Sequence, residues 1–196
     1  MIQPLSEIHY EEISAVTQMQ LRQSEWVFFT SQAAVKPVLA VVPRTIKIAV
    51  IGESTAQAVR GCGFDPTFIS SIPIKEEMLL QWQQEYPQKS TISYPKSQLA
   101  NQQIEQLLSD KHDIYSFIAY TNTQPKGSSQ EIHRLLRTGQ IACVYLTSPS
   151  AWHRFYPLLK KYPETDLTIL TIGETTAKAV RKRGYEAIIK GKWHDR

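Results

Sequence analysis

The sequence contains little cysteine, and this excludes the protein classes that depend on that residue. Cys62 and Cys143 are the two cysteines among 196 residues, and they lie far apart in the chain. They form no CxxC pair and no group with histidines, so neither a disulfide framework nor a zinc site is indicated. The five histidines form no His-x-x-x-His pair, and the carboxylates are not densely clustered. We therefore expect no metal and a reducing, cytoplasmic setting.

Long hydrophobic runs are also absent. Uninterrupted apolar stretches such as Val38 to Val42 are short, whereas a membrane-spanning helix needs about 20 such residues. Glu7, Glu11 and Glu12 stand near the N-terminus, where a secretory signal would carry basic and then apolar residues. The sequence thus predicts a protein without a membrane partner.

Strong charge of either sign is missing as well. The chain has 22 basic and 18 acidic residues and a net charge of +4, which does not support nucleic acid as a partner. The densest basic run, Lys178 to Arg183, falls on a predicted helix. It is either an ordinary solvated helix face or a modest positive field that favours a small polyanion.

The common catalytic and cofactor motifs are not found. The sequence has no Gly-x-Ser-x-Gly element and no histidine spaced to activate a nucleophile. A glycine motif at Ile51 to Ala56 lacks the second and third glycines of a dinucleotide fingerprint. No Gly-Lys-Ser/Thr follows it, as it would in a phosphate-binding loop. We therefore expect no cofactor.

What the sequence does contain is an internal repeat. Residues 51–64 return as residues 172–185, with nine of fourteen positions identical. A second matching pair lies upstream of these motifs, at Trp26 to Val35 and Val144 to Trp152. Solenoid repeats recur about every 20 to 50 residues in roughly three or more copies, so two distant copies predict two homologous lobes. Two similar lobes imply a cleft between them.

Short apolar runs predict strands, and polar caps after them predict helices. The expected strands are Trp26–Phe29, Ile46–Ile51, Thr91–Tyr94, Tyr115–Tyr120, Ile141–Leu146 and Leu167–Ile172, with extended stretches at Pro66–Ile69 and Ala187–Ile189. The expected helices run from Ser31 to Val42, from Gly52 or Ser54 to Gly63, from Ser97 to Leu108, and onward from Ser148 with Pro149 in its first position. Gly63 and Gly184 occupy helix C-cap positions.

Alternating strands and helices with short turns predict an α/β fold. We expect two similar lobes with parallel sheets flanked by helices, joined by a two-stranded β connector, with the cleft between them. The expected domains are a connector strand at residues 1–9, a first lobe at 10–117, a second connector strand at 118–125 and a second lobe at 126–196. A helix is expected from about Glu11, after the first connector strand.

Hydroxyl side chains follow the strands at matching places in both lobes. Ligands of open α/β sheets bind beyond the carboxyl ends of the strands, where helix N-termini offer free N–H groups to anions. The candidate binding residues are Ser31, Gly52, Ser54 and Thr55 in the first lobe and Ser148, Gly173, Thr175 and Thr176 in the second. Each hydroxyl alone is explained as a helix N-cap, and each glycine as a tight turn. The duplicated set favours a shared anion-binding role.

These residues resemble those of the uroporphyrinogen-III synthase family over nearly the whole chain. The resemblance is carried by Phe29–Val35, Val50–Ala56, Tyr120–Thr121, Leu146–Ser150 and Ile172–Ala177. It implies a cofactor-independent, cyclising hydro-lyase of haem biosynthesis. Hydroxymethylbilane would be cyclised to uroporphyrinogen III with inversion of ring D and loss of water. The implied partners are this small-molecule substrate and the preceding enzyme of the pathway, and we expect a monomer.

The resemblance also implies roles for particular residues. Tyr120 matches a family tyrosine that faces the cleft, as proton donor or orienting group; alternatively, it packs at the strand end. Ser31, Thr55, Ser148 and Thr176 match family residues that contact the substrate, and Gly52, Ser54, Gly173 and Thr175 lie in the same motifs. Lys96 matches a basic family position loosely and is interpreted as a surface lysine.

The chain departs from the family pattern at both ends. The opening strand and helix of the family, with their arginine, and its last helix have no counterpart in residues 1–196. The second lobe is therefore expected to lack part of its sheet and of its helical cover. For this reason the alternative function is a non-catalytic or degenerate two-lobed module that binds a tetrapyrrole or another ligand.

Overall fold

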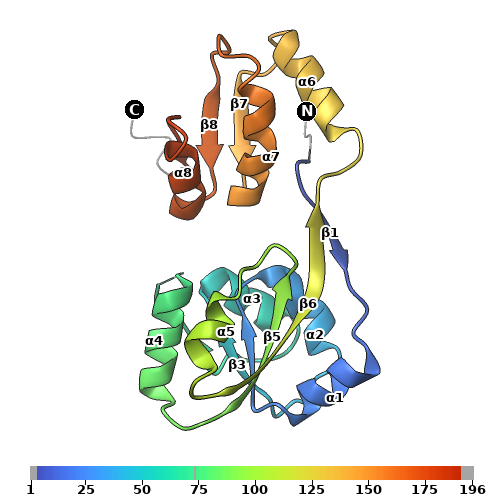
Figure 1. The fold of residues 1–196 in the computed structure, drawn as a ribbon, viewed down its shortest axis with the longest axis vertical. Coiled ribbons are helices and arrows are strands. Elements are labelled where there is room, and N and C mark those ends of the chain that lie inside the picture. The colour runs from blue at the N-terminus through green and yellow to red at the C-terminus, as the bar shows by residue number, and fades with distance from the viewer. Residues whose placement is uncertain (1–3, 73, 191–196) are drawn as a thin grey trace. The chain divides into compact units, whose positions relative to one another are not determined.

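A computed structural model describes residues 4–72 and 74–190, and the chain divides into two compact units (Figure 1). The first unit is Ile8–Asn122, and the second unit combines Met1–Glu7 with Thr123–Arg196. Each unit has its own sheet and its own hydrophobic core.

The first unit contains a six-stranded sheet in the order β1-β6-β5-β2-β3-β4. The strands are β1 (Glu7–Tyr10), β2 (Trp26–Phe29), β3 (Lys47–Val50), β4 (Phe68–Ile69), β5 (Thr91–Ser97) and β6 (Asp113–Thr123). Strands β2 to β6 pair in parallel, while β1 runs against β6 (Figure 1). Five strands of this sheet are therefore parallel, as expected, and the sheet as a whole is mixed because the segment before the first helix adds to the free edge of β6.

Two cores lie on opposite faces of this sheet, and the residues of β2 alternate between them. Val27 and Phe29 pack with the helices α1 to α3, and Trp26 and Phe28 pack with α4 and α5. All four residues of β2 are buried, as expected for a strand covered by helices on both faces. The helical segments are α1 (Ala15–Gln23), the 3₁₀ helix η1 (Gln32–Ala34), α2 (Val35–Leu39), α3 (Glu53–Gly61), α4 (Lys75–Glu85) and α5 (Gln103–Leu108).

Several predicted boundaries in the first unit need correction. The helix expected from Glu11 begins at Ala15, where the Ser14 hydroxyl caps it. Ser97 does not cap a helix, because β5 continues to this residue, which pairs with Tyr120 of β6. The helix expected from Ser31 to Val42 is a 3₁₀ turn followed by a short α2. It ends before Pro43, since a residue that precedes proline is disfavoured in helical conformation.

The second unit contains a three-stranded parallel sheet in the order β7-β8-β9. Its strands are β7 (Cys143–Leu146), β8 (Thr168–Thr171) and β9 (Ile188–Ile189), and its helices are α6 (Ser128–Arg137), α7 (Pro149–Leu159) and α8 (Glu174–Arg181). Ser148 caps α7 and Pro149 opens it, as predicted. Leu5 joins the core of this unit, and its carbonyl accepts a hydrogen bond from Arg154 of α7 at 3.0 Å.

The predicted repeat is confirmed at the level of strands and helices. The first unit has the series β2-α2-β3-α3-β4, and the second has β7-α7-β8-α8-β9. The strand registers agree: Val50 pairs with Ile69 in the first unit, and Thr171 pairs with Ile189 in the second. Positions in one unit can therefore be matched to positions in the other through the backbone.

Among the described residues, the second unit has one hydrophobic core where the first has two. Val144 and Leu146 of β7 face this core with Trp152 of α7. On the opposite face, the side chain of Tyr145 is 42% exposed, and Ile172, just after β8, is 54% exposed. The predicted absence of a final helix concerns residues that include 191–196, which lie outside the described part of the chain.

Candidate functional site

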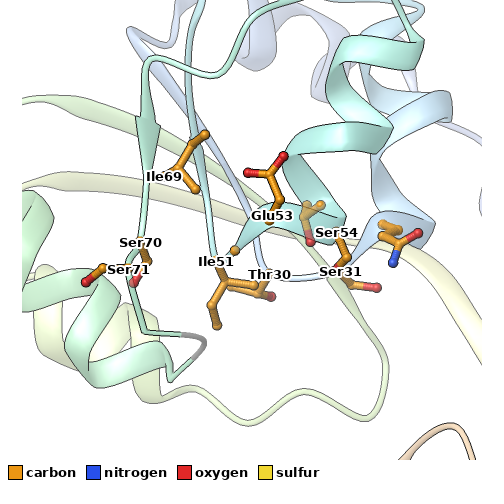
Figure 2. Close-up of a pocket in the computed structure, with 11 residues that line it drawn as sticks. Thr30, Ser31, Ile51, Glu53, Ser54, Ile69, Ser70 and Ser71 are labelled. Carbon is orange, nitrogen blue, oxygen red and sulfur yellow. The ribbon is translucent and has the colours of Figure 1, made fainter. Parts of the chain in front are cut away.

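A pocket of about 720 Å³ lies at the carboxyl ends of β2, β3 and β4 in the first unit. Three loops line it, each leaving a neighbouring strand (Figure 2). The lining residues are Thr30, Ser31, Gln32, Ile51, Gly52, Glu53, Ser54, Thr55, Ile69, Ser70 and Ser71. The sequence analysis identified the first two loops, and the third was missed.

The first loop carries hydroxyls that are partly engaged by the protein itself. The Ser31 hydroxyl accepts a hydrogen bond from the N–H of Ala33 at 3.3 Å and so caps the 3₁₀ helix η1. Thr30 and the buried Tyr94 of β5 join their hydroxyls at 3.3 Å. Burial raises the pKa of Tyr94, so this phenol stays protonated. Ser31 can therefore serve both as a helix N-cap and as a ligand-binding residue, because a hydroxyl that accepts one hydrogen bond can still donate another.

The second loop leads into a helix whose N-terminus is open. Gly52 is the N-cap of α3, and no side chain caps this helix. Its carbonyl accepts from the N–H groups of Thr55 at 3.1 Å and Ala56 at 3.0 Å. The first N–H groups of α3, at Glu53 and Ser54, point toward the N-terminal end, where the helix dipole favours an anion. Gly52 has φ 147° and ψ 173°, a conformation essentially limited to glycine.

The two hydroxyls of this loop lie in different surroundings. Ser54 is exposed in the pocket wall, whereas Thr55 lines the pocket with 3% of its surface exposed. Thr55 precedes Ala56, which belongs to the hydrophobic core beneath α3. Ser54 is therefore the more accessible of the two predicted hydroxyls.

The third loop holds two serines in fixed positions. The Ser70 hydroxyl donates to the carbonyl of Ile72 at 2.6 Å, and the Ser71 N–H donates to the Gln81 side-chain oxygen at 3.2 Å. The Gln81 amide in turn donates to the Ser71 hydroxyl at 2.9 Å. This loop follows β4, the third strand of the repeated unit, so the rule that ligands bind beyond strand ends was the signal that would have found it.

The second unit repeats the first two loops. The Ser148 hydroxyl accepts from the N–H of Ala151 at 3.2 Å, and α8 begins at an N-cap, Gly173, without a side-chain cap. Thr175 is exposed, and Thr176 has 3% of its surface exposed. Gly173 differs from Gly52, because its φ of −171° is extended backbone that any residue adopts. The two open helix N-termini are thus matched in position but not in backbone conformation.

An ion pair is duplicated on the two helices that begin at these N-termini. Arg60 donates to Glu53 at 2.7 Å on α3, and Arg181 donates to Glu174 at 3.0 Å on α8. Glu53 is the charged residue among the described residues that line the pocket. The ion pair offsets its charge, which would otherwise repel an anion.

Tyr120 lies near the end of β6 and Lys96 near the end of β5. In the sheet these two strands lie on the opposite side of β2 from β3 and β4, whose ends line the pocket. Tyr120 is 8% exposed and belongs to the core cluster with Ala119; it is not among the described residues that line the pocket. Lys96 is not a surface lysine: its side chain is 14% exposed and pairs with Glu105 of α5. Burial acts to raise the pKa of Glu105, but hydrogen bonds from Lys96, from the backbone and from Ser116, together with the positive charge of Lys96, outweigh it and hold that pKa below its ordinary value.

Within residues 4–72 and 74–190, no group of three or more histidine, cysteine, aspartate or glutamate side chains is arranged to hold a metal ion. None of the helices in this part of the chain has the length and apolar character needed to cross a membrane.

The fold and the site define an α/β protein of two units, each with the same repeated series and an open helix N-terminus beyond its strands. Residues 1–192 match the model of the family described as uroporphyrinogen-III synthase HemD. The chain belongs to this family. No curated protein matches the sequence.

Solved structures share the fold at low sequence identity. A mutant uroporphyrinogen III synthase from the bacterium Thermus thermophilus matches with a TM-score of 0.71 at 12% identity, over 96% of this chain and 81% of that chain. The wild-type protein in a second crystal form matches with 0.59 at 14%, over 96% and 81%. Uroporphyrinogen-III synthetase from Helicobacter pylori matches with 0.64 at 19%, over 97% and 86%.

Proposed function

We propose that this chain is a uroporphyrinogen-III synthase that cyclises hydroxymethylbilane to uroporphyrinogen III with inversion of ring D and loss of water. One observation carries the proposal. This chain belongs to the family, and its helices α3 and α8 begin at equivalent positions, Gly52 and Gly173, without a side-chain cap. We propose that the protein acts without a cofactor, as a cytoplasmic monomer.

The charge of the substrate fits these sites. Hydroxymethylbilane is a linear tetrapyrrole with eight carboxylates, and open helix N-termini with nearby hydroxyls are suited to carboxylates. We assign Ser31, Ser54 and Thr55 of the first unit to substrate carboxylates and pyrrole N–H groups, and we assign Ser148, Thr175 and Thr176 of the second unit in the same way. Gly52 and Gly173 would let the substrate approach the backbone closely.

The proposed reaction asks for little covalent chemistry from the protein. The C–O bond of the hydroxymethyl group breaks, the oxygen leaves as water with a proton from a donor, and an electrophilic azafulvene remains. This carbon bonds to the substituted ring-D carbon to give a spiro intermediate, and the bond from that ring-D carbon to the bridge toward ring C then breaks. The bridge carbon bonds to the unsubstituted α-carbon of ring D, and loss of the proton from that carbon leaves ring D aromatic and inverted. We assign the proton donation or the orientation of the leaving hydroxyl to Tyr120, whose place near the end of β6 supports this assignment.

The test of the function is a product assay. Freshly prepared hydroxymethylbilane is incubated with the full chain, and isomers III and I are separated, because isomer I forms spontaneously. We expect isomer III to predominate. Isomer I alone would contradict the synthase activity and favour a module that binds a tetrapyrrole without catalysis.

The role of Tyr120 has its own test. Tyr120→Phe removes the hydroxyl and keeps the ring in the core, so we expect kcat to fall by about 10²-fold or more with KM little changed. Tyr10→Phe is the matched control, since Tyr10 lies on β1 of the same unit and is 59% exposed. If Tyr120→Phe has the kcat of the control, Tyr120 serves packing alone.

A further inference from the structure

The first-unit pocket has no positive charge among its described lining residues, although its proposed ligand is a polyanion. The eleven lining residues include one charged group, Glu53, and that group is negative. A cation for this ligand must therefore come from a residue outside this pocket lining.

The third loop of the pocket has a counterpart in the second unit that the backbone identifies. The Ser70 N–H donates to the carbonyl of Val50 at 2.9 Å, and the Lys190 N–H donates to the carbonyl of Thr171 at 2.8 Å. Both residues directly follow the last strand of the repeated series, β4 and β9. Lys190 therefore stands in the second unit where Ser70 lines the pocket of the first.

Ser70 and Lys190 differ in charge, in solvent exposure and in whether their side chains are held by hydrogen bonds. Ser70 is 3% exposed, and its hydroxyl is engaged by the carbonyl of Ile72. Lys190 is exposed, and its ammonium lies 5.7 Å from the centre of the Tyr145 ring. A lysine over an aromatic face is attracted to the ring and keeps its donors available.

Tyr145 is also an equivalent position with a changed environment. Cys143 to Leu146 match Trp26 to Phe29 by strand order and register, so Tyr145 stands where the first unit has Phe28. Phe28 is fully buried beneath α4, whereas Tyr145 is 42% exposed. The exposed ring is thus available to hold the Lys190 side chain across β8.

We propose that Lys190, held over the ring of Tyr145, binds a carboxylate of the substrate at the carboxyl ends of the second unit's strands. The inference rests on the proposed function and adds a cation to it. In this arrangement the second unit supplies a positive charge in addition to the hydroxyls and backbone N–H groups already assigned to it. Lys190 is a binding residue, and Tyr145 is a positioning residue that acts through it.

The experiment compares the KM for hydroxymethylbilane among variants of the full chain. A charged hydrogen bond is worth about tenfold or more in affinity, so Lys190→Ala should raise KM about tenfold with kcat nearly unchanged. Lys190→Arg should stay within about threefold of the parent. Lys182→Ala is the matched control, because Lys182 is an exposed lysine at the C-terminal end of α8, away from the helix N-terminus at Gly173.

Two readouts separate binding from a merely structural role. Added salt should raise the KM of the parent more steeply than that of Lys190→Ala, since salt screens the charge that the variant has lost. Tyr145→Phe should leave KM unchanged, while Tyr145→Ala raises it less than Lys190→Ala does. The double variant should match Lys190→Ala alone, because Tyr145 acts through Lys190.

The outcomes distinguish this inference from the proposed function. If the parent makes isomer III and Lys190→Ala has the KM of the Lys182→Ala control, the Lys190 site is wrong and the synthase activity stands. If the parent makes isomer I alone, the activity is wrong, and the site is judged by titration with uroporphyrin III, followed by tryptophan fluorescence. A tenfold weaker binding of uroporphyrin III by Lys190→Ala would then support the site, and equal binding would overturn it.

Discussion

The two units use the same strand-helix-strand-helix-strand series but complete it differently. In the first unit, β5 and β6 extend the sheet past β2, and α4 and α5 cover the face opposite to α2 and α3. In the second unit, the described chain ends its sheet at β7, and one face alone has a hydrophobic core. The repeated series therefore builds the binding loops, while the added elements decide which face of the sheet is buried.

The difference is clearest at equivalent strand positions. Phe28 contacts Trp26 and Trp82 edge to face, with ring centres 6.3 and 4.8 Å apart. Its counterpart Tyr145 has Lys190 over its ring. One position thus belongs to a packed core and the other to a polar surface, although both stand on the first strand of the same kind of parallel pair.

The largest expected effect is on the free energy of unfolding, and it tests whether Phe28 and Tyr145 differ in burial. Phe28→Ala should destabilise the first unit by about 3–5 kcal/mol, because it leaves a cavity among large rings. Tyr145→Ala should change the stability of the second unit by no more than about 0.5 kcal/mol, as for exposed positions in general. Urea unfolding of both variants, followed by circular dichroism, gives the two values. A loss of several kcal/mol in Tyr145→Ala would mean that this face is covered in solution.

The glycines of the repeat give the next largest difference. Gly52→Ala should cost about 1–3 kcal/mol, since φ 147° is strained for any residue with a Cβ. Gly173→Ala should leave the fold intact, because its φ is extended and a Cβ there would meet no atom within 4 Å. Thermal unfolding measures both effects.

The same pair of variants separates folding from binding. If Gly173 serves close approach of the substrate, Gly173→Ala should raise KM while its unfolding curve matches the parent. A Gly173→Ala variant with unchanged KM would show that the methyl group does not reach the ligand. Equal unfolding curves for Gly52→Ala and the parent would contradict the strain assigned to Gly52.

The sequence was sufficient for the repeated series and its caps. β2 was predicted with its observed bounds, and the cap of α7 at Ser148 was predicted with its proline, because both depend on local residue types. The end of α5 at Leu108 was predicted but its start was not, since β5 continues to Ser97 through its pairing with β6, which is a distant segment. The half-buried pair of Lys96 and Glu105 follows from that pairing and was missed for the same reason.

The candidate site was predicted in part. Ser31, Gly52, Ser54 and Thr55 do line one pocket, because strand ends and helix starts are local features. Ser70 and Ser71 were missed, since β4 has two residues and gives little periodic signal. Whether Tyr120 and the loops of the second unit act on one substrate with these residues stays a prediction.

The next smaller effect is a pH dependence of the stability of the first unit, which depends on the buried residue His112. His112 is 3% exposed, contacts Trp82 and accepts at Nδ1 from the Ser90 N–H at 3.3 Å. Burial lowers the pKa of His112 in the folded state, so the unfolded chain binds a proton first on acidification. Stability of the first unit is therefore full above the ordinary histidine pKa and falls as the pH drops below it, by at most about 1.4 kcal/mol per pH unit.

His112→Asn removes the titrating ring and keeps an acceptor for Ser90. We expect it to be less stable than the parent at pH 8 but to lose less stability between pH 7 and pH 5. His153→Gln is the control, because His153 is exposed on α7 of the second unit. A His112→Asn variant with the same acid sensitivity as the parent would assign that sensitivity to other groups.

The smallest effect concerns the duplicated ion pairs. Double-mutant cycles on Glu53 with Arg60 and on Glu174 with Arg181 should give similar coupling energies of about 0.2–1 kcal/mol, since both pairs are exposed. The single variants should differ, because Arg181 also donates to the carbonyl of Ala187 at 3.1 Å. Arg181→Ala is therefore expected to cost about 1 kcal/mol more than Arg60→Ala. Urea unfolding of the four single and two double variants gives these energies. Unequal coupling energies, together with equal effects of Arg60→Ala and Arg181→Ala, would contradict the conclusion that the two ion pairs are equivalent and differ only in the additional hydrogen bond of Arg181.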